Sequence, residues 1–265
     1  MKLSLAQYEV ARADAAANLD RIAGLAAQAR VSGSDLLCLP EMCTTGFDWE
    51  SNRQQLDAAA GHAEAVAAIA RSQGIAICGS LLEQTEAAGA ANTFHYFDAQ
   101  GAWLAKYRKL HLFTLFHEER HVTAGSESVS FETDFGRFGA TICYDLRFPE
   151  LYRRLTELGA GLIFVPAAFP HPRLQHWQTL LRARAIENQV YIVATNQCGR
   201  EGHGNDVGDI HYFGHSMVID PWGEIVAEAG EDACLLEVEV DIGQVDKVRS
   251  RLSAWEDRRK DLFSF

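Results

Sequence analysis

The sequence alternates short, strongly apolar runs with longer segments of helical periodicity. The apolar runs are too short for surface helices and predict strands covered on both faces. They lie at 35–40, 75–83, 138–143, 161–166 and 190–195, after a first run at 3–8. The helical segments lie between them, at 14–30, 61–73, 148–158 and 176–188, the first with Asp14 as its cap. This alternation predicts an α/β protein with crossover helices.

Two further pairs of strands indicate antiparallel hairpins. NTFHYF (92–97) and AWLAKY (102–107) flank one turn, and HSMVI (215–219) and EIVAEA (224–229) flank another. Both turns contain Asp and Gly, which favour hairpin closure. The sheet structure should therefore be mixed, of class α/β or α+β. Because no linker or composition break divides the chain, we expect one domain over residues 1–265.

Charge and composition limit the partners. The formal net charge is −12, which disfavours binding to nucleic acid or anionic lipid. No apolar run approaches the roughly 18 residues of a membrane span, and charged residues interrupt the N-terminal run, so a cytoplasmic location is expected. The basic cluster Lys247–Lys260 is interleaved with acids and predicts a solvated or subunit-contacting segment. The six cysteines include no C-x-x-C pair and are predicted to be reduced thiols.

Cys143 is the first candidate for chemistry. The predicted strand ends there, and Phe148-Pro149-Glu150 begins a helix with proline in a favoured position. Amide donors and a helix dipole at such an elbow favour thiolate over thiol, which would make the cysteine a nucleophile. Inert packing is the ordinary role of a buried cysteine, so this position alone does not decide the matter.

Two residues of complementary chemistry also follow predicted strands. Glu41 comes directly after the run 35–40, and Lys109 follows the strand over 102–107. Ligand sites in open α/β sheets lie at the carboxyl ends of strands. A cysteine, an acid and a base that converge on strand ends therefore predict a nucleophilic active site.

Five motifs resemble the nitrilase superfamily of carbon-nitrogen hydrolases. They are LPEMCTTGF (39–47), YRKLHLF (107–113), GATICYDLRFPELYR (139–153), HWQTLLRARAIENQVYIVATNQCG (176–199) and GHSMVIDPWGEIVAEAG (214–230). They appear in the family's order and cover nearly the whole chain. Within the family, CYDLRFPELY (143–152) and GHSMVIDPWGE (214–224) resemble omega-amidases and the related amidases of deaminated glutathione.

The resemblance implies a fold and a set of roles. The fold would be a four-layer αββα sandwich with mixed sheets, in a homodimer or higher homo-oligomer to which the C-terminal tail (about 242–265) contributes. Cys143 would be the nucleophile, Glu41 the general base and Lys109 the oxyanion stabiliser, together with the backbone N–H of Tyr144. Glu118 would be a second glutamate, although Glu119 beside it keeps that assignment open. No metal or organic cofactor is needed.

The implied substrate is a small amide that carries a carboxylate, such as 2-oxoglutaramate or 2-oxosuccinamate, cleaved to acid and ammonia through a thioester. Deaminated glutathione and N-carbamoyl or aliphatic amides are alternatives within the same superfamily. Arg173 would bind the carboxylate. Phe47 and Phe169 would line the pocket. The alternatives are that Arg173 is an exposed loop residue and that the two phenylalanines only pack in the core.

One motif points to a different class of enzyme. His117-Glu118-Glu119-Arg120-His121 matches the H-E-x-x-H pattern of zinc peptidases. That site needs both histidines on one face of a long helix, whereas this segment is predicted to be a loop with at most a short helical turn. The glycine-rich run GREGHG (199–204) does not open a helix, so it predicts a mobile loop near the site rather than a phosphate-binding loop.

Overall fold

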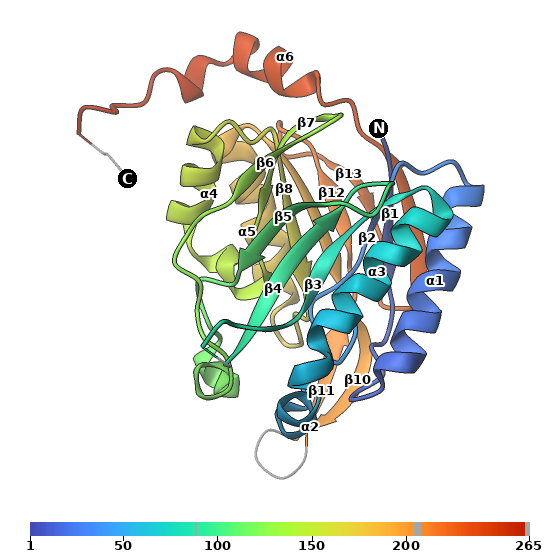
Figure 1. Cartoon of the computed structure of the whole chain (residues 1–265). Helices are drawn as coiled ribbons and strands as arrows, with labels where there is room; N and C mark the ends of the chain where they lie inside the picture. Colours follow the sequence, from blue (N-terminus) through green and yellow to red (C-terminus); the bar gives the residue numbers. More distant parts are fainter. Residues whose placement is uncertain (88, 204–207, 263–265) are drawn as a thin grey trace.

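The computed structural model describes residues 1–87, 89–203 and 208–262. Two six-stranded sheets lie face to face, and helices cover the outer face of each, which gives four layers (Figure 1). The prediction of an αββα sandwich with mixed sheets is confirmed. No helix in the described part of the chain is both long and apolar enough to cross a bilayer.

The first sheet has the strand order β14-β1-β2-β3-β4-β5. Strands β1, β2 and β3 are parallel, and the other pairings are antiparallel. Helices α1 and α3 cover its outer face (Figure 1). The bounds are β14 (Cys234–Glu239), β1 (Lys2–Gln7), β2 (Leu36–Cys38), β3 (Ala76–Gln84), β4 (Ala90–Phe97), β5 (Trp103–Arg108), α1 (Ala15–Val31) and α3 (Ala59–Gln73).

The second sheet has the order β13-β12-β9-β8-β7-β6. Strands β7, β8 and β9 are parallel, and the outer pairings are antiparallel. Helices α4 and α5 lie on its outer side (Figure 1). The bounds are β13 (Ile225–Glu228), β12 (Met217–Ile219), β9 (Tyr191–Asn196), β8 (Leu162–Ala167), β7 (Gly136–Ala140), β6 (Ser130–Thr133), α4 (Pro149–Glu157) and α5 (Leu174–Asn188).

Apolar side chains fill the space between the sheets. Phe94 of β4 stacks on Phe164 of β8 with ring centroids 5.9 Å apart, so the two sheets are in direct contact. A second core lies between the first sheet and its helices, where Ile22, Val66 and Ile77 are buried. Each strand in the middle of a sheet is therefore covered on both faces, which explains why the predicted runs are almost wholly apolar.

Shorter elements connect these layers. They are α2 (Trp49–Gln54), η1 (Leu56–Ala58), η2 (Thr114–Phe116), η3 (Glu118–Arg120), η4 (Cys143–Arg147), β10 (Cys198–His203), β11 (Gly208–Phe213), α6 (Gln244–Arg251) and η5 (Ser253–Trp255). Residues 199–203 of the glycine-rich run belong to strand β10, and Gly204 lies outside the described residues. The C-terminal segment with α6 runs across one end of the sandwich and extends beyond α4 (Figure 1).

The strand predicted over 138–143 is shorter than expected, because β7 ends at Ala140. The carboxylate of Asp145 accepts a hydrogen bond from the backbone N–H of Ile142 at 2.9 Å, so this donor does not continue the sheet. Cys143 follows with a φ of +44°, in the left-handed region. The chain then forms η4, and α4 begins only at Pro149.

Candidate active site

Strand ends from both sheets meet at one pocket. Strand β5 runs parallel to β2, so Glu41 after β2 and Lys109 after β5 lie at the same edge of the first sheet. Cys143 comes from the loop after β7 in the second sheet. The pocket contains about 330 Å³ of empty space, part of it open to solvent, and it is lined by Glu41, Phe47, Trp49, Lys109, Phe113, Phe116, Glu118, Cys143, Ala168 and Tyr212.

The Lys109 ammonium lies between two carboxylates. Its Nζ donates to Glu41 Oε1 at 2.8 Å and to both oxygens of Glu118 at 3.0 and 2.8 Å. All three side chains are at most 2% exposed. A buried ion needs such partners, because its transfer from water would otherwise cost several kcal/mol.

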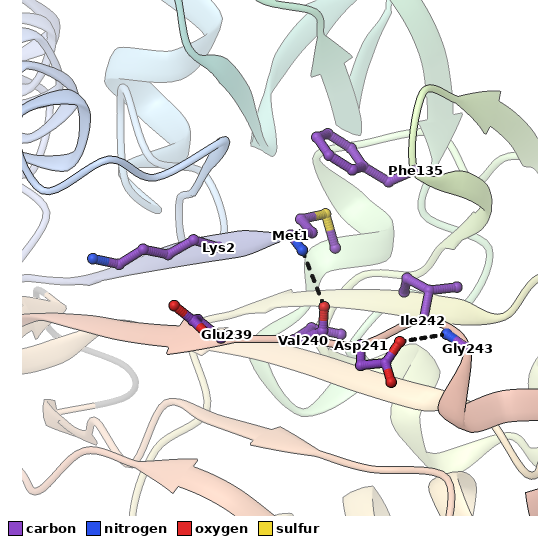
Figure 2. Close-up of a pocket in the computed structure, with 8 residues that line it drawn as sticks. All are labelled: Met1, Lys2, Phe135, Glu239, Val240, Asp241, Ile242 and Gly243. Carbon is purple, nitrogen blue, oxygen red and sulfur yellow. Dashed lines mark hydrogen bonds between the residues drawn. The ribbon is translucent and has the colours of Figure 1, made fainter. Parts of the chain in front are cut away.

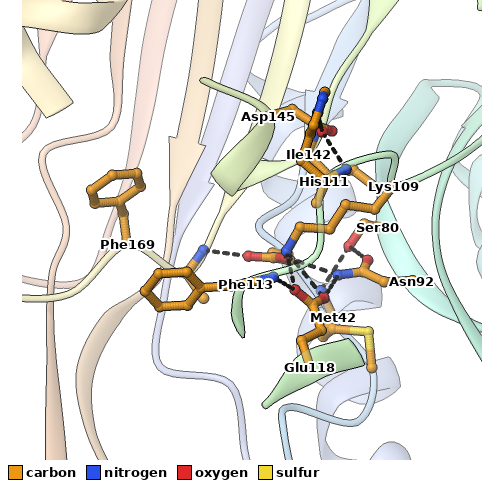
Figure 3. A network of polar contacts seen from close by, with 12 residues as sticks. Met42, Ser80, Asn92, Lys109, His111, Phe113, Glu118, Ile142, Asp145 and Phe169 are labelled. Atoms are coloured by element: carbon orange, nitrogen blue, oxygen red, sulfur yellow. Dashed lines mark hydrogen bonds and ion pairs between the residues drawn. The ribbon is translucent and has the colours of Figure 1, made fainter. Parts of the chain in front are cut away.

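Neutral donors fix the two carboxylates in place (Figure 3). Asn92 Nδ2 donates to Glu41 Oε1 at 2.8 Å and to Glu118 Oε1 at 3.2 Å, and Asn92 is itself oriented by the Ser80 hydroxyl at 2.8 Å. The other oxygen of Glu41 accepts the backbone N–H of Ala168 at 3.0 Å. Because Ala168 follows β8, this bond joins the two sheets at the pocket.

The balance of burial and neighbouring charges raises the pKa of both Lys109 and Cys143. Burial works against the Lys109 charge, but Glu118 and Glu41 outweigh it and raise the lysine pKa well above its ordinary value. Burial and the charge of Glu41 raise the pKa of the Cys143 thiol, and Lys109 only partly offsets them. The raised pKa runs against the expectation that the elbow favours a thiolate, and it favours the neutral thiol of Cys143.

Asp145 secures the backbone that carries Cys143. Its buried carboxylate accepts the Tyr107 hydroxyl at 2.8 Å, the backbone N–H of His111 at 3.0 Å and the N–H of Ile142 at 2.9 Å. His111 Nδ1 also lies 2.7 Å from Asp145 Oδ1. A non-glycine residue with positive φ costs about 1–3 kcal/mol, and this network compensates for that strain at Cys143.

The H-E-x-x-H segment does not have the geometry of a zinc site. Glu118 begins η3 and contacts Lys109, whereas Glu119 is partly exposed and lies 3.9 Å from His117 Nδ1. The ring of His121 stacks on Trp49 at 5.1 Å. Among the residues that the structure describes, the histidine and carboxylate side chains close enough to share an ion do not include His117 or His121.

A second lobe of the pocket also reaches Cys143. Its lining residues are Phe113, Cys143, Tyr144, Arg147, Ala168, Phe169, Pro170 and Arg173. Arg173 lies over the Phe113 ring at 5.7 Å, and Arg147 over the Phe169 ring at 5.5 Å. Burial and the neighbouring charge of Arg147 lower the pKa of Arg173. Within the described part of the chain, neither guanidinium forms an ion pair with a carboxylate.

A larger opening, of about 1180 Å³, lies near the N-terminus (Figure 2). Met1 and Val240 line it, and the terminal ammonium of Met1 donates to the Val240 carbonyl at 3.1 Å. Gly243 N donates to Asp241 Oδ1 at 3.0 Å. This opening lies at the amino end of β1, opposite to Glu41, and among the described residues its lining contains no cysteine or histidine. We therefore assign the chemistry to the smaller pocket around Cys143.

Comparison with known proteins shows the family of the chain. The sequence profile described as carbon-nitrogen hydrolase matches residues 2–250. The chain belongs to the carbon-nitrogen hydrolase family. The resemblance seen in the sequence motifs is confirmed, and this carbon-nitrogen hydrolase is an enzyme that acts on the C–N bonds of amides.

Several relatives of this carbon-nitrogen hydrolase are named amidases. The 2-oxoglutaramate amidase of Bacillus subtilis is 37% identical over 231 residues, which cover 87% of each chain. An omega-amidase NIT2-A of Xenopus laevis is 32% identical and covers 99% of this chain and 96% of its own. A deaminated glutathione amidase of Synechocystis is 41% identical over 183 residues, 65% of each chain.

Solved structures show the same architecture. An amidase from Nesterenkonia sp. superposes on 99% of this carbon-nitrogen hydrolase and 94% of its own chain, with a TM-score of 0.86 and 28% identity. A mutant of that amidase shows covalent addition of the acetamide moiety of fluoroacetamide at the active-site cysteine. A carbon-nitrogen hydrolase from Helicobacter pylori, 24% identical, shares the fold with a TM-score of 0.92 over 98% of this chain and 96% of its own.

Sequence reasoning missed several residues of this carbon-nitrogen hydrolase site. Asn92 and Ser80 lie inside apolar strands, and a buried polar residue in such a run was the available signal, because it needs a hydrogen-bond partner. Asp145, two residues after Cys143, gave the same signal. Arg147 also belongs to the second lobe, while the predicted Phe47, Phe169 and Arg173 all line one lobe or the other.

Proposed function

We propose that Cys143 attacks the amide carbon and that Glu41 takes the thiol proton. The charges of the pocket support this order. With one ammonium and two carboxylates around it, a thiolate would add another buried negative charge. Transfer of the proton from Cys143 to Glu41 leaves the net charge unchanged. A buried thiol beside a carboxylate is therefore suited to attack that is coupled to proton transfer.

The remaining steps use the same groups. As the Cys143 sulfur bonds to the carbonyl carbon, the oxygen becomes an anion, which Lys109 and the backbone N–H of Tyr144 would stabilise. Tyr144 is the second residue of η4, and the first N–H groups of a helix have no acceptor within it. Glu41 then returns its proton to the nitrogen, ammonia leaves and a thioester remains. Glu41 next accepts a proton from water, whose oxygen attacks the thioester. The acid leaves as the carbon–sulfur bond breaks, and Glu41 returns the proton to the Cys143 sulfur.

Glu118 has a supporting part in this proposal. Both of its oxygens accept hydrogen bonds from Lys109, so it orients the ammonium and keeps it charged. Its oxygens are not available to act as a second base, because they also accept hydrogen bonds from Asn92 and from the Phe113 N–H. We therefore assign Glu118, rather than Glu119, as the auxiliary glutamate.

The substrate is proposed to be a small amide with a remote carboxylate, of the 2-oxoglutaramate or 2-oxosuccinamate type. The observation that carries this proposal is the pair Arg147 and Arg173 in the lobe beside Cys143, without a carboxylate partner in the described residues. Arginine binds carboxylate through two parallel hydrogen bonds. The names of the Bacillus and Xenopus relatives point to the same class. The Synechocystis relative makes deaminated glutathione the second candidate.

Ammonia release from a panel of substrates tests this assignment. The panel contains 2-oxoglutaramate, 2-oxosuccinamate, deaminated glutathione, an uncharged amide of similar length, an N-carbamoyl amino acid and a nitrile. A charge-assisted hydrogen bond contributes about 1.5–3 kcal/mol, so kcat/KM should be roughly 10- to 150-fold higher for the carboxylate amide than for the uncharged one. Preference for the uncharged amide would exclude the arginine assignment, and preference for deaminated glutathione would select the second candidate.

The assembly and location expected from the sequence stay predictions. We propose one domain over residues 1–265 and a homodimer in the cytoplasm, with the tail over about 242–265 in contact with the second subunit. Two leucines of this tail support the contact, since Leu252 is 50% exposed and Leu262 is 61% exposed. Sedimentation of the full chain and of a chain that ends at residue 241 would test it.

A further inference from the structure

Three side chains of types that can bind a metal come from distant parts of the sequence and meet beside the pocket. His171 lies between β8 and α5, His211 lies in β11, and Glu231 lies between β13 and β14. A nitrogen of each imidazole and an oxygen of the carboxylate all lie within 4.8 Å of one another. His171 Nε2 and Glu231 Oε1 are 3.4 Å apart. None of these residues takes part in the amide hydrolysis proposed above.

Their geometry approaches that of a metal site. Zn²⁺ bonds to imidazole nitrogen and carboxylate oxygen at about 2.0–2.2 Å, so tetrahedral ligand atoms lie about 3.4 Å apart. The distance between His171 and Glu231 already has this value. The longest separation in the group would have to close by about 1.4 Å, and the Glu231 side chain, 49% exposed, has room to rotate. Solvent can supply the fourth ligand.

The two imidazoles are positioned by contacts that need no ion. His171 N donates to the His211 carbonyl at 2.9 Å, and a β-bridge joins Pro170 to Tyr212. The His171 ring also packs edge-on against Phe213 at 5.4 Å. The two histidines are therefore kept together by backbone pairing, which lowers the entropic cost of binding an ion.

We propose that His171, His211 and Glu231 bind one divalent transition-metal ion of the Zn²⁺ or Ni²⁺ class. Two imidazoles and a carboxylate are donors that these ions accept. A bound ion would link the segment 168–173 to β11 and to the turn before β14. That segment contains Ala168, which binds Glu41, and Arg173. The ion therefore stabilises one wall of the pocket and has no part in the bond cleavage.

Titration of the metal-free protein, without an affinity tag, tests the site. Zn²⁺ binding is measured by calorimetry, and Co²⁺ binding by visible absorption. We expect one ion per chain and a higher Tm in its presence. His171→Ala and His211→Ala should each weaken binding by roughly tenfold or more, since loss of a ligand exceeds the 10- to 100-fold cost of losing a supporting partner. Glu231→Gln should also weaken binding, and it carries little risk to folding because Glu231 lies at an exposed position.

Two controls separate this site from other ligands. The His117→Ala/His121→Ala variant removes the sequence motif and should bind Zn²⁺ as the wild type does. The exposed thiol of Cys234 lies three residues after Glu231, so Cys234→Ser should also bind normally. Co²⁺ should show no thiolate charge-transfer band. Unchanged binding in His171→Ala and His211→Ala, loss of binding in either control, or no binding at all would overturn the proposal. Substrate is absent throughout, so the result does not depend on the proposed amidase reaction.

Discussion

Replacement of Glu118 by Gln tests the proposed role of the buried ion network. Each Glu118 oxygen accepts two hydrogen bonds, one from Lys109 and the other from Asn92 or from the Phe113 N–H. Gln has nearly the same shape but only one acceptor oxygen. In either orientation its NH₂ group would face Lys109 and one further donor. The lysine would lose a charged partner, and a buried donor would lose its acceptor.

The magnitude follows from these contacts. A hydrogen bond to a charged group contributes about 1.5–3 kcal/mol, and the loss misplaces the ammonium that would stabilise the oxyanion. If this whole loss appears in the transition state, kcat should fall roughly 10- to 150-fold. The pKa of Lys109 should also fall, because Glu118 is the largest of the charges that raise it. KM should change less than kcat.

Steady-state ammonia release from 2-oxoglutaramate measures this effect, with Tm recorded to confirm that the variant is folded. Glu119→Gln is the matched control, since Glu119 is adjacent in sequence, is 39% exposed and pairs with His117 and Arg120 rather than Lys109. It should retain the wild-type kcat within about twofold. A Glu118→Gln enzyme within twofold of wild type, or an equal loss in Glu119→Gln, would refute the reasoning.

Three further changes have defined outcomes. Arg173→Met should lower kcat/KM for 2-oxoglutaramate roughly 10- to 150-fold and leave hydrolysis of an uncharged amide nearly unchanged; an equal loss for both substrates would mean that Arg173 does not bind the carboxylate. Asp145→Asn leaves donors around Cys143 unpaired, so Tm should fall by roughly 2–12 °C in calorimetry, and an unchanged Tm would contradict the network. Burial raises the pKa of Cys43 from 9.0 to about 12. Because the thiol ionises at lower pH in the unfolded chain, the free energy of unfolding falls as pH rises through this window. In urea titrations, Cys43→Ala should reduce the slope of that fall by about 1.4 kcal/mol per pH unit. Parallel curves for the two proteins would show that Cys43 contributes nothing.

Local patterns carried much of the fold prediction. The runs that became β3, β8 and β9 are apolar on both faces because they lie between two layers, and the cap Asp14 marked the start of α1. Strands β6 and β14 gave weaker signals because they lie at sheet edges with partly exposed faces. The hydrophobic pattern also could not predict that β7 ends early, because that end depends on the Asp145 carboxylate.

The candidate site was only partly visible in the sequence. Glu41, Lys109 and Cys143 each follow a strand, so their meeting could be expected from topology and from the family motifs. The protonation state of Cys143 could not be expected from the sequence, because it depends on burial and on the charge of Glu41 rather than on the local elbow. Likewise, His171 and His211 meet through the pairing of two segments forty residues apart in the sequence, and no local motif encodes that contact.

Detection of an acyl group on Cys143 tests the central claim most directly. The enzyme is mixed with excess 2-oxoglutaramate, quenched in acid within one turnover and digested, and the peptide that contains Cys143 is analysed by mass spectrometry. The account predicts a hydroxylamine-sensitive thioester on Cys143 and no ammonia release by the Cys143→Ala variant. An acyl group on another residue, or undiminished turnover in Cys143→Ala, would contradict it.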